Sequence, residues 1–172
     1  GVVHKAALLA KADLTTELVK EFTELQGIVG GLYTRVQELD PDMKADAREA
    51  VAVAIYDHYK PESMEDPVPR TVEGAVLSIA DKADSIAGMF ALGLQPTGSK
   101  DPFALRRQAN GIVKTSAEHK MPVRISQLIK YARAAYRGSA AEMKRAATVV
   151  STQAGHHFLS ERRQFSFGLS QG

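Results

Sequence analysis

Apolar residues recur every three or four positions along most of this chain, which is the period of one face of an α-helix. The clearest stripe runs through Val76, Ile79, Ala83, Ile86 and Phe90. The same spacing predicts further helices over residues 6–22, 25–39, 45–59, 101–119, 125–137 and 139–150. No segment shows the alternation of apolar and polar residues that marks a half-buried strand. The pattern therefore predicts an all-α fold.

Proline and glycine indicate where these helices end or touch one another. Three prolines between residues 60 and 70 predict a loop, and Thr71 is placed to open the helix after it. Glycines also interrupt the helix predicted over 25–39, although each costs roughly 1 kcal/mol against alanine. We expect them where this helix closely approaches another backbone: Gly27, Gly30 and Gly31.

Residues 95–107 combine a helix-breaking loop with a helix start. Asp101 is a good N-cap because its carboxylate accepts hydrogen bonds from unpaired first-turn amides, and Pro102 needs no donor at the first helical position. Such a start would fix the directions of Lys100, Arg106 and Arg107. The segment is typical of a surface that holds an anion.

A nucleotide-binding P-loop is a poor explanation for this segment. Gly93, Gly98, Ser99 and Lys100 resemble that motif only superficially, because the P-loop places its lysine before the hydroxyl residue. No predicted strand leads into the loop, and Pro96 removes a backbone donor.

The composition excludes several classes of protein. The chain has 172 residues, enough for one well-buried core, and 44% of them are hydrophobic. It contains no cysteine, which excludes disulfides and thiolate chemistry. No apolar run approaches the roughly 20 residues of a membrane-spanning helix, and the first residues do not resemble a signal peptide. We expect a cytoplasmic protein with no membrane contact.

The net charge of +2 conceals an uneven distribution. Residues 1–99 carry 9 Lys/Arg and 16 Asp/Glu, a net charge of −7, whereas residues 100–172 carry 13 and 4, a net charge of +9. This asymmetry indicates either a polyanion-binding surface on the basic half or attraction between the two halves within one fold. For the first alternative, the candidate phosphate-contact residues are Lys100, Arg106, Arg107 and Lys114.

A second group of residues has the chemistry of a metal site. His58 follows the helix over 45–59, while Asp81 and Asp84 share a face of the next helix, and Asp13 could join them. Imidazole and carboxylates together bind divalent metals that activate water. The alternative is that His58 favourably ends its helix and the aspartates are solvated.

Four stretches carry a resemblance to a known family. They are ALLAKADL at 7–14, EFTELQG at 21–27, ADKAD at 80–84 and PTGSKDPFALRR at 96–107. These stretches resemble the β subunit of bacterial heterotetrameric glycyl-tRNA synthetase, most densely between residues 6 and 115. The resemblance implies an internal segment of a longer subunit. Its residues 1–153 would form an HD-like helical bundle, and residues 154–172 would begin a following helical segment.

The resemblance also implies a degenerate HD site. Active HD phosphohydrolases use a histidine, a His-Asp doublet and a later aspartate around a metal, but Ala10 and Lys11 stand where the doublet is expected. We therefore expect no catalytic residue and no bound metal, and we hypothesise that Lys11 occupies the vacated cation position. The expected remnants of the site are Lys11, Asp13, His58, Asp81 and Asp84.

In this family the α subunit activates glycine with ATP and Mg²⁺, and the β subunit supplies tRNA recognition within an α2β2 assembly. The resemblance therefore implies a non-catalytic domain, without a cofactor of its own, that docks tRNA-Gly or contacts the α subunit, and no DNA-binding role. One alternative is a metal-dependent HD-type phosphohydrolase using His58, Asp81 and Asp84. Another is an interaction module that contacts the α subunit and never binds RNA.

Overall fold

The computed structural model describes residues 1–37 and 43–136, whose regular structure is entirely helical, so the predicted all-α fold is confirmed for these residues. The helices predicted beyond residue 136, and the segment 154–172, lie outside them. The α-helices are α1 (Val2–Leu9), α2 (Glu17–Glu21), α3 (Ile28–Val36), α4 (Ala45–Asp57), α5 (Val72–Ala91), α6 (Leu105–Glu118) and α7 (Ile125–Ala134). Two short 3₁₀ helices, η1 (Ala12–Thr15) and η2 (Thr23–Leu25), lie on either side of α2.

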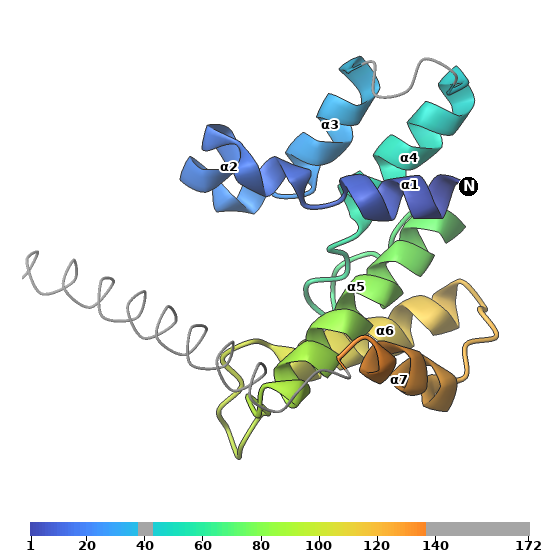
Figure 1. Cartoon of the computed structure of the whole chain (residues 1–172). Helices are drawn as coiled ribbons and strands as arrows, with labels where there is room; N and C mark the ends of the chain where they lie inside the picture. The colour runs from blue at the N-terminus through green and yellow to red at the C-terminus, as the bar shows by residue number, and fades with distance from the viewer. Residues whose placement is uncertain (38–42, 137–172) are drawn as a thin grey trace, which may run out of the picture.

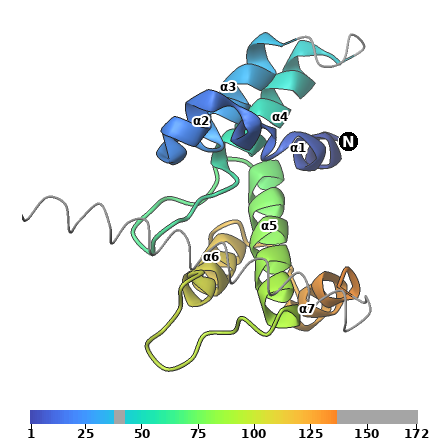
Figure 2. The same cartoon turned by 60° about the vertical axis from the view of Figure 1, so that its left-hand side comes forward.

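Helix α5 is the axis of the fold, and the other helices pack at its two ends (Figure 1). Its first half packs against α1 and α4, and its second half packs against α6 and α7, as the turned view also shows (Figure 2). Each end has its own apolar cluster. The first consists of Ala6, Val51, Ala54, Ile55 and Leu77, and the second of Ile79, Ala83 and Ile112. The stripe read from the sequence thus supplies Ile79 and Ala83 to the second cluster and Ile86 to its border.

The single helix predicted over residues 6–22 is wrong. The chain instead forms α1, η1 and α2, because α1 ends at Leu9, where Ala10 turns to an extended ψ of 140°, and Lys11 then adopts a left-handed conformation with φ of 68°. Thr16 then caps α2 by accepting a hydrogen bond from the amide of Val19 at 3.3 Å. The break turns the side chain of Lys11 toward Tyr59 and Asp81, near the end of α4 and on α5, and that of Asp13 toward the start of α3.

The predicted close approach at the glycines is confirmed between α3 and α4. A Cβ atom on Gly31 would lie 2.7 Å from the Cβ of Tyr56 and 2.8 Å from the carbonyl oxygen of Ala52. No side chain fits in that space, so α3 can pack this closely on α4 only with glycine there. Arg35 adds a two-pronged ion pair across the same helices, with its Nε 2.8 Å from a carboxylate oxygen of Glu49.

Lys82 lies inside the fold, on the stripe of α5 that faces α4 and α6. Only 5% of its surface is exposed. Its Nζ donates to the carbonyl oxygens of Tyr59 at 2.9 Å and Lys60 at 3.1 Å, and to Oγ of Ser78 at 3.0 Å. Burial lowers the pKa of Lys82 to about 8. The Lys82 ammonium therefore donates hydrogen bonds to carbonyl groups at the end of α4, for which the helix has no further backbone amides.

The loop between α4 and α5 is held by Asp57, whose side chain is fully buried. Its carboxylate accepts hydrogen bonds from Nε of Arg70 at 2.7 Å, the amide of Arg70 at 3.0 Å and Nζ of Lys60 at 2.8 Å. Burial alone raises the pKa of Asp57, but the hydrogen bonds from Arg70 and Lys60 outweigh it and lower that pKa. Thr71 then caps α5, as predicted, by accepting from the amide of Gly74 at 3.1 Å.

We predict that Asp57→Asn lowers the free energy of unfolding by about 2–3 kcal/mol, because it leaves two cations beside a neutral amide. The pKa of Asp57 is lower in the folded than in the unfolded state, so the wild-type carboxylate stabilises the fold fully above its unfolded pKa. That stabilisation is lost as the pH falls through the folded pKa, so the two proteins should converge in stability below about pH 4. Urea unfolding followed by circular dichroism at several pH values measures both effects.

Glu65→Gln is the matched control, because Glu65 is exposed in the same loop. It should leave the unfolding midpoint unchanged. An equal loss for both variants, or a difference for Asp57→Asn that persists at acid pH, would contradict the role given to the Asp57 carboxylate.

Candidate functional site

The first candidate site is the group of predicted phosphate-contact cations, and it begins with the turn that leads into α6. Helix α6 starts at Leu105, so the prediction that Asp101 is the N-cap and Pro102 the first helical residue is wrong. Residues 101–104 form a turn, closed by a hydrogen bond from the amide of Ala104 to the carbonyl of Asp101 at 3.1 Å. The Asp101 carboxylate reaches over this turn and accepts from the amides of Leu105 at 2.8 Å and Arg106 at 2.9 Å. The predicted hydrogen bonds from first-turn amides to the Asp101 carboxylate are therefore present, but the helix begins three residues later than predicted.

Three of the predicted cations are exposed around this helix start. Lys100 ends a tight turn in which its backbone pairs with that of Thr97, while Arg106 and Arg107 lie in the first turn of α6. Within residues 1–37 and 43–136, none of the three forms an ion pair with an acidic side chain. Their positive charge therefore faces solvent in this part of the structure, with Asp101 as the nearby acid whose pKa the charges of both arginines help to lower.

Lys114, the fourth predicted cation, is placed differently. Its Nζ donates to the carbonyl oxygens of Met64 at 2.7 Å and Asp66 at 2.6 Å, and lies 3.8 Å from a carboxylate oxygen of Glu118. One turn further along α6, His119 Nε2 lies 2.7 Å from the carbonyl oxygen of Pro69. Both side chains fasten the proline-containing loop to α6, so the ammonium of Lys114 is already occupied.

The second candidate group lies where α1, α4 and α5 meet. Lys11 Nζ is 3.0 Å from Oδ1 of Asp81 and donates to the hydroxyl of Tyr59 at 3.2 Å. The ammonium also sits 4.3 Å from the centre of the Tyr59 ring, in a cation–π arrangement. Burial lowers the pKa of Lys11, but the charge and hydrogen bond of Asp81 outweigh burial and raise it. Lys11 is therefore a fixed cation at neutral pH.

His58 lies beside this pair and is completely buried. Its Nδ1 is 2.6 Å from the carbonyl oxygen of Ile55, and since a carbonyl only accepts, the proton lies on Nδ1. Nε2 then carries a lone pair and has no hydrogen-bond partner. Burial lowers the pKa of His58, and the positive charges of Lys11 and Lys82 lower it further. A neutral imidazole thus presents one unpaired nitrogen in this group.

The two remaining predicted residues face elsewhere. Asp13 is buried and caps α3, because its Oδ2 accepts from the amides of Gly27 at 2.7 Å and Gly30 at 3.0 Å. Asp84 accepts from the hydroxyl of Tyr136 on the other side of α5, at 2.9 Å. In the part of the chain that the structure describes, no three His, Asp or Glu side chains are grouped to hold a metal ion.

Comparison with known proteins supplies the family. Residues 1–169 match the sequence profile described as glycyl-tRNA synthetase beta subunit. This chain belongs to that family. A glycine–tRNA ligase beta subunit from Acidobacterium capsulatum is 59% identical over 128 residues, and one from Trichodesmium erythraeum is 47% identical over 128 residues. Each alignment covers 74% of this chain but only 17% of the relative.

Membership of the glycyl-tRNA synthetase β-subunit family agrees with the resemblance read from four short stretches. The match extends to residue 169, well beyond the dense region of that resemblance. A Clostridioides difficile glycine–tRNA ligase beta subunit is 49% identical over 128 residues, with the same coverage of both chains. Among the helices of the described residues, none is both long enough and apolar enough to span a membrane.

Sequence analysis of this family member missed two residues that define the second group. Tyr59 holds Lys11 from one side, and Lys82 fixes the carbonyl of Tyr59 from the other. A signal for Lys82 was available, since it is a lysine within the apolar stripe of α5, three residues after Ile79. No comparable signal marked Tyr59, because its role depends on the left-handed turn at Lys11.

We predict that Lys11→Met raises the pKa of His58. The substitution removes a positive charge that lowers this pKa and leaves the charge of Asp81, which raises it. Because Lys11 is half-exposed, methionine fits without new strain in the core. The measurement is an NMR titration of the His58 imidazole in both proteins.

Lys20→Met is the control, since the Lys20 ammonium pairs with Glu17 at the surface of α2. The His58 titration should be the same in this variant as in the wild type. If Lys11→Met also left it unchanged, the electrostatic coupling described here would be wrong.

Proposed function

We propose that this chain is a tRNA-docking domain of the β subunit of glycine–tRNA ligase, the enzyme that attaches glycine to tRNA-Gly with ATP. The observation that carries the proposal is the exposed set of cations around the start of α6, Lys100, Arg106 and Arg107. None of them forms an ion pair within residues 1–37 and 43–136. Unpaired arginines on a rigid helix are suited to phosphate, because the guanidinium binds two oxygens at once.

The charge distribution supports an RNA contact on this side. Attraction between the acidic and basic halves would pair these arginines with acids from residues 1–99, and no such pair is present in the described parts. Phosphate neutralisation releases counterions and gives an affinity that depends steeply on salt. We assign Lys114 a bracing role instead, since it holds the proline loop.

Membership of the family supports a proposal for the wider assembly. We propose that the chain acts with a glycyl-tRNA synthetase α subunit in the cytoplasm, and that ATP and Mg²⁺ bind at the α-subunit active site. Contact of this domain with the α subunit is a further part of the proposal. A pull-down with the α subunit beside a tRNA titration separates the two roles.

We also propose that the HD-like site does no hydrolysis. The Lys11 ammonium lies 3.0 Å from Asp81, where it neutralises the carboxylate that a metal would need. His58 keeps an unpaired nitrogen, but Asp13 uses one carboxylate oxygen to cap α3, Asp84 accepts from Tyr136, and no three His, Asp or Glu side chains of the described residues are grouped to hold a metal ion. A single imidazole and one neutralised carboxylate are too few ligands for a catalytic divalent ion.

We predict that Arg106→Ala together with Arg107→Ala weakens binding of tRNA-Gly about tenfold at moderate salt. The slope of log K against log salt should fall by about one to two, as expected for the loss of two phosphate contacts. Fluorescence anisotropy with labelled tRNA-Gly, over a series of salt concentrations, measures both quantities.

The matched control is Lys20→Ala together with Lys44→Ala, which removes two exposed cations from the acidic half. If this control lost as much affinity as the arginine variant, the effect would be one of net charge alone. If the arginine variant kept its affinity at every salt concentration, this surface would not be the docking site.

We predict further that crystals soaked in Mn²⁺ show no ordered ion at His58 and Asp81, because the Lys11 ammonium already pairs with the Asp81 carboxylate. Anomalous diffraction at the manganese edge makes the measurement. The protein should also release no phosphate from nucleotides or phosphodiesters in the presence of Mn²⁺. An ordered ion with hydrolytic activity would favour the phosphohydrolase alternative.

A further inference from the structure

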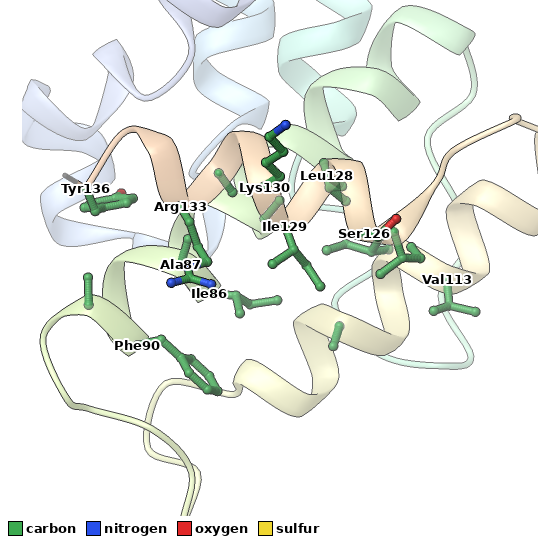
Figure 3. A pocket seen from close by; sticks show the side chains of 16 residues that line it. Ile86, Ala87, Phe90, Val113, Ser126, Leu128, Ile129, Lys130, Arg133 and Tyr136 are labelled. Carbon is green, nitrogen blue, oxygen red and sulfur yellow. The ribbon is translucent and has the colours of Figure 1, made fainter.

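An apolar groove lies over the second half of α5. Helices α6 and α7 each pack on α5, with few contacts between them, and the groove runs between these two helices over α5 (Figure 3). Its volume is about 1000 Å³. The side chains that reach into it come from all three helices and remain about half exposed: Phe90, Val113, Ile125 and Ile129.

A continuous apolar surface of this kind on a folded domain is typical of a docking site. Small-molecule pockets of up to about 1000 Å³ usually contain a few converging polar groups. Here most of the lining side chains are alanine, valine, leucine, isoleucine and phenylalanine, the polar ones are Ser126, Lys130, Arg133 and Tyr136, and the hydroxyl of Tyr136 is already bonded to Asp84. Two walls of helix above a helical floor instead suit the apolar face of another helix.

The charges around the groove indicate which helix would fit. Among the described residues that line it, the only charged side chains are those of Lys130 and Arg133, both cationic. Arg133 extends toward Ile86 and Ala87 over the groove, whereas Lys130 points away at its outer edge (Figure 3). From residue 119 to residue 136 the sequence has no Asp or Glu at all. A helix with carboxylates beside its apolar stripe would therefore be attracted here.

From these observations we infer that the groove binds an amphipathic helix of a partner polypeptide, with Asp or Glu residues flanking its apolar stripe and pairing with Arg133. The partner is distinguished by this chemistry, and the inference does not depend on the RNA contacts at Lys100, Arg106 and Arg107. Arg133 is the specificity-determining residue, and Ile129 is the central apolar contact.

Other occupants fit these charges less well. Residues 137–172 carry five Lys/Arg and two Asp/Glu, so their net charge has the same sign as that of Arg133. A second copy of the same groove would bring two Arg133 side chains together about a two-fold axis. RNA bases stack on aromatic or guanidinium planes, and the exposed side chains here are mainly aliphatic.

The test uses the full 172-residue chain and two synthetic peptides of about 18 residues, five turns of helix. Both peptides carry the same leucine stripe, flanked in one by glutamate and in the other by lysine. In fluorescence anisotropy the glutamate peptide should bind about tenfold more tightly than the lysine peptide. Arg133→Glu should remove that preference, and Ile129→Glu should abolish binding of both peptides.

Arg124→Glu is the matched control. It makes the same change of charge on the exposed N-cap of α7, at a residue that does not line the groove. It should keep the preference for the glutamate peptide to within about twofold, since exposed charges outside the contact are screened. Circular dichroism should show that Ile129→Glu remains folded, because Ile129 is already 52% exposed.

Several results would overturn the inference. Equal affinity for the two peptides, or no binding of either, would exclude an acid-flanked helix as the occupant. An equal effect of Arg124→Glu and Arg133→Glu would reduce the preference to net charge. Sedimentation showing a dimer that Ile129→Glu dissociates would assign the groove to a second copy. NMR contacts between residues 137–172 and Ile129 would assign it to the chain itself.

Discussion

The buried ammonium of Lys82 connects α5 to the carbonyl groups just after α4, and the stem of this lysine contacts α6. It takes up the free carbonyls at the end of α4 while it belongs to α5. Its aliphatic stem lies against α6, where a Cβ on Gly111 would come within 3.1 Å of the Lys82 Cε. Removing a charge from water is costly, and the cost is visible in the lowered pKa of this lysine. An apolar side chain at this place would leave the carbonyl of Tyr59 without the donor that it has here, which is costly too, whereas that of Lys60 would keep its hydrogen bond from Ser78.

The rest of the Lys11 group depends on this connection. Because Lys82 fixes the carbonyl of Tyr59, the tyrosine ring keeps its place beneath Lys11 and beside the His58 imidazole, 4.0 Å away. Asp81, the residue before Lys82 on α5, is thereby brought to the Lys11 ammonium. The positions of the predicted remnants thus follow from a residue that was not among them.

The fold was predictable where the cause is local. The stripe on α5, the Thr71 cap and the glycines that let α3 approach α4 are all short-range features of the sequence, and the structure contains each of them. The helix over residues 6–22 failed because its apolar spacing is helical while Lys11 takes a left-handed conformation. Contacts of Lys11 with Tyr59 and Asp81, some 50 to 70 positions away in the chain, favour that conformation. The spacing of apolar residues gives no information about such contacts.

The same distinction applies to the candidate sites. A capped start for the helix that carries Arg106 and Arg107 could be predicted, although it lies three residues later than expected, but the sequence left open whether these arginines are exposed or paired with acids of the first half. The hydrogen bonds of the Lys114 ammonium could not be predicted, because the carbonyl oxygens that accept them lie about 50 residues earlier in the chain. Asp13 and Asp84 were grouped with His58 by residue type, and only the packing of α3 and α7 reveals that each serves a different neighbour.

The carboxylate of Asp101 also limits how α6 can meet an anion. A free helix start offers bare amides and a positive dipole, which hold a phosphate in one direction and at one distance. Here the amides of Leu105 and Arg106 are already taken by an internal carboxylate. An approaching phosphate therefore meets long side chains with many rotamers rather than a rigid backbone cradle. Such flexible side chains can contact phosphates at different positions along the curved backbone of a folded nucleic acid. They cannot hold one phosphate at a single fixed position.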